Sequence, residues 1–112
     1  MRTYYQIEAE HERKIIRQYN DLGFEGIRSA GSKGAHSKEH KSLIDLVVWN
    51  KEIIVFIASQ CVPWDVKKQK WIWESFKIRP PNSKMFFRGI DYYGREIIED
   101  GDELAEREGW KR

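Results

Sequence analysis

The residue that points most clearly to a chemical role is a carboxylate in an apolar setting. Asp45 interrupts the run LIDLVVW at residues 43–49. Because an unpaired charge is costly to bury, such a carboxylate usually has a metal ion, another cation or a proton as its partner. Glu12 is also unusual, since helical spacing places it at the edge of the apolar stripe of a predicted helix. The alternative for Glu12 is an ordinary solvated charge among its neighbours Glu8, Glu10 and Arg13.

Asp45 belongs to a predicted β-hairpin, around which the rest of the fold is expected to be organised. The apolar runs 43–49 and 53–60 are rich in Ile and Val and are separated by three polar residues. Neither run alternates with polar residues, which indicates strands covered on both faces. A two-residue turn, either Asn50–Lys51 or Lys51–Glu52, would place Asp45 on the face of Ala58 and Gln60. A three-residue turn would reverse this, and Asn at a first turn position favours Asn50–Lys51.

The other predicted elements complete an α/β domain that spans residues 1–112. Their expected ranges are a helix at 3–22, a short strand at 24–30, a polar loop at 31–41, a helix at 64–77, and strands at 84–90 and 92–98. The last residues, 99–112, predict one or two helical turns or a frayed tail. Helices that alternate with strands in this order predict a sheet crossed by helices.

Composition excludes several classes of protein. The chain has 112 residues, a net charge of +2 and a single cysteine, Cys61, which cannot form an internal disulfide. No apolar run approaches the roughly 18 residues of a membrane span, and no signal peptide is recognisable. We therefore expect no membrane association and a cytoplasmic location. The charge is too small to argue for nucleic acid by itself, so the distribution of basic residues must carry that argument.

Basic residues cluster in the polar loop and at the start of the second helix. Small residues in the loop leave backbone N–H groups accessible while lysines supply charge, which suits a phosphate backbone. A solvated surface loop is an equally good interpretation. The candidate DNA contacts from this pattern are Arg28, Lys33, Lys38, Lys41, Lys67 and Lys68. Tryptophans in the second helix favour a core or interface role over base stacking.

Several motifs together resemble the archaeal Holliday junction resolvases of the PD-(D/E)xK nuclease superfamily. They are Glu12-Arg13, Gly23-Phe24, IRSAGSKG at 27–34, IDLVV at 44–48 and IASQ at 57–60, which cover about half of the chain. The resemblance implies a restriction endonuclease-like α/β fold, with a mixed sheet of about five strands flanked by two helices. It also implies a homodimer that binds DNA, including branched DNA, and hydrolyses phosphodiesters with Mg²⁺.

The resemblance also assigns roles to individual positions. Glu12 and Asp45 match two metal-binding carboxylates, and Ser32 matches a hydroxyl that contacts the DNA backbone. Gln60 occupies the position of the catalytic lysine, and Ala58 replaces a third metal-binding carboxylate. Losing one transition-state donor lowers a rate on the order of 10²–10³-fold, and here a metal ligand is missing as well.

Three functions follow as hypotheses. The first is a DNA-binding protein with this nuclease fold whose own hydrolysis is weak or lost. The second is an active, divergent Mg²⁺-dependent endonuclease that uses Glu12, Asp45 and Gln60, with Lys67 or Lys70 as a displaced lysine or Glu39 as a substitute carboxylate. The third is a protein-binding module that reuses the fold and docks a partner through its tryptophan-rich helix.

Overall fold

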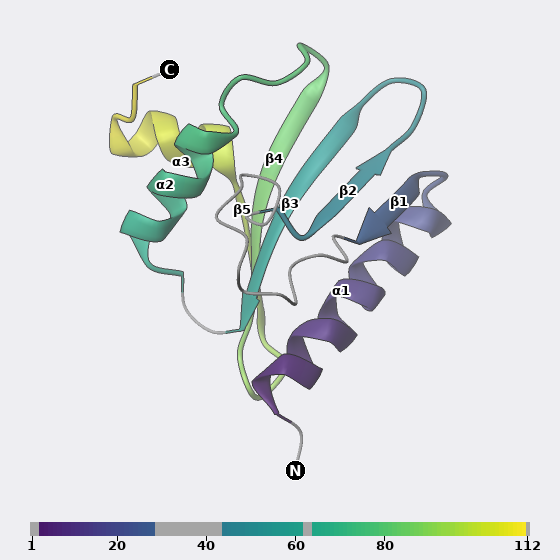
Figure 1. The fold of residues 1–112 in the computed structure, drawn as a ribbon. Helices are drawn as coiled ribbons and strands as arrows, with labels where there is room; N and C mark the ends of the chain where they lie inside the picture. The colour runs from purple at the N-terminus through teal and green to yellow at the C-terminus, as the bar shows by residue number, and fades with distance from the viewer. Residues whose placement is uncertain (1–2, 29–43, 62–63, 112) are drawn as a thin grey trace.

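A five-stranded mixed sheet forms the centre of the protein in a computed structural model, which describes residues 3–28, 44–61 and 64–111 (Figure 1). The sheet has the order β1-β2-β3-β4-β5; β3 and β4 are parallel and the other neighbours are antiparallel. The elements are α1 (Tyr4–Asp21), β1 (Glu25–Arg28), β2 (Leu46–Trp49), β3 (Ile54–Cys61), α2 (Val66–Ser75), β4 (Ser83–Ile90), β5 (Glu96–Asp100) and α3 (Gly101–Glu108). The predicted α/β class and sheet size are confirmed.

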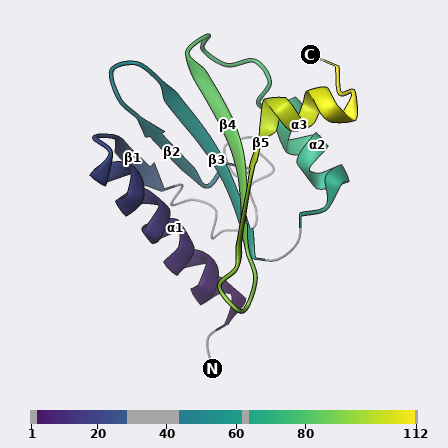
Figure 2. The ribbon, with the colours of Figure 1, turned by 180° about the vertical axis from the view of Figure 1, so that it is seen from behind.

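Helices cover both faces of the sheet, as Figures 1 and 2 show from opposite sides. On one face, Ile15 of α1 packs on apolar side chains of β2 and β3. On the other face, Trp73 of α2 and Leu104 of α3 pack on Ala58 and Phe87 of the sheet. The absence of alternation along β2 and β3 is explained by these two apolar layers.

The turn between β2 and β3 sets the register on which the position of Asp45 depends. Trp49 pairs with Ile54, and the N–H of Asn50 donates to the carbonyl of Ile53, which closes a two-residue turn at Lys51–Glu52. Asn50 precedes the turn and its side chain accepts from the N–H groups of Glu52 and Ile53. The turn is therefore Lys51–Glu52, and the favoured alternative, Asn50–Lys51, is wrong. Continued by one residue, the register places Asp45 across from Ala58.

The helix ends follow local sequence signals. Thr3 and Gln6 form a capping box at the start of α1, and Asp65 caps α2 as predicted by accepting from the N–H of Lys67. The C-terminal residues form α3 rather than a frayed tail, because Asp100 caps its start and Gly109 ends it with φ +74°. None of the helices in the described ranges is long and apolar enough to cross a bilayer.

Candidate functional site

Ser59 on β3 joins the two predicted carboxylates. Its backbone N–H donates to Oδ2 of Asp45 at 2.8 Å, and its hydroxyl donates to Oε2 of Glu12 at 3.0 Å. Asp45 comes from the residue before β2 and Glu12 from the middle of α1, so one residue of the central strand connects both elements. The structure thus brings Glu12 and Asp45 into one site at the C-terminal end of β3.

A second layer of contacts holds the helix side of this site. Arg28, at the end of β1, donates to Oε1 of Glu12 from Nε and Nη2, each at 3.0 Å. One turn before Glu12, Oε1 of Glu8 accepts from the backbone N–H of Cys61 at 2.8 Å. The Glu12 side chain is 13% exposed and that of Arg28 is 36% exposed, so the pair is sheltered at the carboxylate and open to solvent at the guanidinium. Arg28, predicted to contact DNA, is therefore already paired with a carboxylate.

A lysine of α2 lies beside the position where the resemblance expects one on the strand. Nζ of Lys68 donates to Oε1 of Gln60 at 2.8 Å and lies 5.8 Å from the ring centroid of Trp64. Its charge also acts on Asp45, where it lowers the pKa. The lysine that contacts Gln60 is thus Lys68. Nζ of Lys70, one of the expected candidates, instead lies 3.8 Å from Oε1 of Glu74 on its own helix.

Asp45 is the most strongly perturbed carboxyl of the site. Burial raises its pKa from 3.8 to about 7, and the negative charges of Glu12 and Glu8 add to this. The hydrogen bond from the Ser59 N–H and the charge of Lys68 act in the opposite direction but do not restore the ordinary value. Asp45 is consequently a group that can take up or release a proton near neutral pH.

The residues present do not fit a Mg²⁺ site as they stand. Both oxygens of Glu12 already accept hydrogen bonds, and its charge is neutralised by Arg28. Ala58, at the position of the missing carboxylate, has no exposed surface and packs in the apolar layer under α2. Magnesium prefers a near-octahedral set of oxygens. Within residues 3–28, 44–61 and 64–111, no group of three or more Asp, Glu, His or Cys side chains is placed to hold a metal ion.

Sequence reasoning missed two parts of this site and several of its predictions cannot be placed. Ser59 was missed, although strand alternation puts it on the opposite face from Ala58 and therefore toward α1. The contact between Glu8 and the end of β3 was also missed. Lys67 is exposed in the first turn of α2, next to Lys68. The other predicted residues of the polar loop, Ser32, Lys33, Lys38, Glu39 and Lys41, lie outside the described residues.

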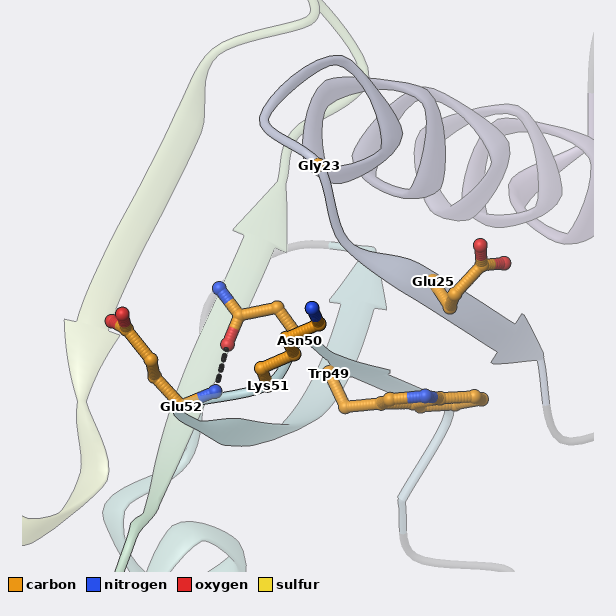
Figure 3. A pocket seen from close by; sticks show the side chains of 6 residues that line it. All are labelled: Gly23, Glu25, Trp49, Asn50, Lys51 and Glu52. Carbon is orange, nitrogen blue, oxygen red and sulfur yellow. Dashed lines mark hydrogen bonds between the residues drawn. The ribbon is translucent and has the colours of Figure 1, made fainter.

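A separate hollow of about 530 Å³ lies at the other end of the sheet (Figure 3). It lies between the turn after α1 and the β2–β3 turn, and Trp49 at the end of β2 is among its lining residues. Glu25, Lys51 and Glu52 supply charges of both signs along its walls. None of the predicted site residues lines this hollow, and its mixed charges select no ligand class.

The sequence matches no known family model, and no curated protein is significantly similar to it.

Proposed function

We propose that this protein binds DNA through a Holliday junction resolvase-like nuclease fold, with phosphodiester hydrolysis that is weak or lost. The supporting observation is Ser59, which holds Glu12 and Asp45 together at the end of the central strand. The resemblance assigns these same two carboxylates to a catalytic pair. The same neighbourhood contains Ala58 and Gln60 in place of a carboxylate and a strand lysine.

The loss of hydrolysis is supported by the state of the two remaining carboxylates, Glu12 and Asp45. Arg28 takes the place that a cation would need at Glu12, and Asp45 is partly protonated at neutral pH. Neither condition favours a tightly held divalent metal, which requires ionised ligands. DNA binding is supported by the exposed lysines 67 and 68 at the start of α2, and by Trp71 on the same helix, which is 56% exposed. Branched DNA and a homodimer are parts of this proposal.

The test is the salt dependence of binding to a four-way DNA junction, measured by fluorescence anisotropy. If the predicted cations contact phosphates, log K should fall with log [NaCl] with a slope of about −5. The double variant Lys67→Ala, Lys68→Ala should reduce that slope by about 2, since each lost phosphate contact contributes roughly 0.9. Lys51→Ala, at the opposite end of β3, is the matched control and should leave the slope unchanged. A flat salt dependence would contradict DNA binding and favour a protein-binding role.

An active divergent endonuclease is the second candidate, favoured by the lysine that lies at Gln60. Lys68 places one positive charge beside Gln60 and acts on Asp45, as a displaced catalytic lysine would. Under this function, Mg²⁺ or Mn²⁺ should produce nicks in a four-way junction, and Lys68→Ala should abolish them while Lys67→Ala does not. On the first proposal, the unchanged protein binds the junction but produces few or no nicks with either metal, and Lys68→Ala does not change their number.

A further inference from the structure

A cavity between α1 and the turn that joins β4 to β5 has the features of a second binding site. Its volume is about 430 Å³, within the range of pockets that bind small ligands. Ile7 and Ile90 form apolar parts of the wall, and Tyr92 lies at the turn. The cavity lies at the end of β4 and the turn that follows it, whereas the site at Ser59 lies at the end of β3. The residues that form the site at Ser59 do not line this cavity.

Two cations on the wall have no ion-pair partner among the described residues. Lys14 and Arg17 lie one turn apart on α1, and neither makes an ion pair or side-chain hydrogen bond with the described part of the chain. The wall also carries Glu10 and Asp91. The carboxylate of Asp91 is neutralised by Arg95, whose Nε donates to Oδ2 at 2.7 Å. Lys14 and Arg17 are therefore the lining groups that can meet an anionic group, on a wall that also carries the carboxylate of Glu10.

A buried polar group at the same cavity lacks a partner. His11 is 3% exposed and contacts Glu96 through Nε2, while Glu96 also accepts from Arg88 at 2.8 Å. The other ring nitrogen, Nδ1, is buried and has no hydrogen-bond partner among the described residues. Such orphaned buried groups are uncommon in folded proteins and often mark functional positions.

Exposed aromatic rings adjoin the cavity. Tyr92 makes edge contacts with Tyr4 and Tyr93, each at a centroid separation of 6.1 Å, and Tyr93 is 84% exposed. The guanidinium of Arg95 lies 6.0 Å from the Tyr93 ring. Aromatic rings beside free cations are the arrangement by which proteins bind the base and phosphate of a nucleotide together.

We propose that this cavity binds a nucleotide, with the phosphate at Lys14 and Arg17 and the base against Tyr92 and its neighbouring rings. The nucleotide can come from a free mononucleotide or from single-stranded DNA, because both present the same two groups. Binding of single-stranded DNA here would rest on the proposed DNA-binding function, whereas binding of a free mononucleotide would be independent of it.

The test uses dTMP and an eight-residue oligo(dT) as probes, with binding followed by the NMR signals of His11 and Tyr92. Both signals should move in a saturable way. Lys14→Ala combined with Arg17→Ala should weaken binding at least tenfold, and Tyr92→Ala should weaken it roughly tenfold while Tyr92→Phe does not, as base stacking predicts. Arg13→Ala and Tyr5→Ala are matched controls on the same helix, since neither residue lines the cavity. Tighter binding of the oligonucleotide would identify single-stranded DNA as the source, and equal binding a free nucleotide.

Two results would overturn the proposal. One is the absence of saturable shifts with both probes in the folded protein. The other is an equal loss of binding in the Arg13 and Lys14/Arg17 variants, which would show only a general effect of charge. Junction binding measured on the same variants separates this site from the proposed function. If the protein does not bind the junction, saturable dTMP binding still supports this site. If it binds the junction but not dTMP or oligo(dT), the proposed function stands and this site is ruled out.

Discussion

At pH 8 the Asp45→Asn protein is expected to resist unfolding better than the unchanged protein by up to about 4 kcal/mol, and at pH 4 by almost nothing. The gap between the ordinary pKa of 3.8 and the folded value of about 7 corresponds to roughly this energy, at about 1.4 kcal/mol per pKa unit. Between these values the folded protein retains a proton that the unfolded chain has released. Stability therefore falls as the pH rises from about 4 to 7, and the penalty is complete above 7. Asparagine cannot ionise, and its amide oxygen can still accept from the Ser59 N–H.

Urea denaturation at pH 4, 6 and 8 measures this effect, as the difference between the two proteins at each pH. Asp21→Asn, at the exposed end of α1, is the control and should change stability by no more than about 1 kcal/mol. If the unchanged protein and the Asp45→Asn variant were equally stable at pH 8, the Asp45 carboxylate would be fully paired in the folded protein. If Mg²⁺ stabilised the unchanged protein but not the Asp45→Asn variant, that partner would be a metal ion and the proposed loss of metal binding would be wrong.

The second large effect is expected for Ala58→Glu, which should destabilise the protein by roughly 3 to 5 kcal/mol at pH 8. An uncompensated charge in a protein interior has about this cost. Ala58 has no exposed surface and packs with Trp73 and Phe87, so a carboxylate there lies in an apolar layer. The loss is a large fraction of the 5–15 kcal/mol typical of a folded domain. Thermal unfolding followed by circular dichroism measures it.

Ala58→Gln is the matched control, because it adds nearly the same volume without the charge. It should be destabilised less than Ala58→Glu at pH 8, and the difference should shrink at pH 4, where the glutamate is protonated. If the two variants were equally stable at pH 8, the new carboxylate would lie in a polar environment near Asp45 and not in the apolar core. Metal-dependent cleavage of a four-way junction by Ala58→Glu combined with Gln60→Lys would then assign position 58 to a metal site and contradict its placement in the core.

The order of the elements could be predicted from the sequence because local signals specify it. Apolar runs, a polar turn and capping residues each act over a few positions, and they located the hairpin, α1, α2 and β4. The strand predicted at 92–98 begins only at Glu96, because Asp91 and Arg95 close a turn before it. The parity of the hairpin also followed, since either two-residue turn gives the same face for Asp45. The third helix remained open between a helix and a frayed tail. It is stabilised by tertiary contacts such as the bond from Trp73 Nε1 to Asp102 at 2.9 Å, which no local pattern contains.

The sequence by itself determined which residues could do chemistry at the predicted site, because Asp45 in an apolar strand and Glu12 beside an apolar stripe are visible in one dimension. Only the tertiary structure decided their partners. Ser59 bridges them, Arg28 neutralises Glu12, and Lys68 rather than Lys70 reaches Gln60. It also decided that His11 on α1 meets Glu96 on β5. The pairings of α1 with Ser59 and Glu96 join segments 47 and 85 residues apart, and Lys68 reaches Gln60 from the helix that follows its strand. The packing of α1 and α2 on opposite faces of the sheet brings these groups within hydrogen-bonding distance.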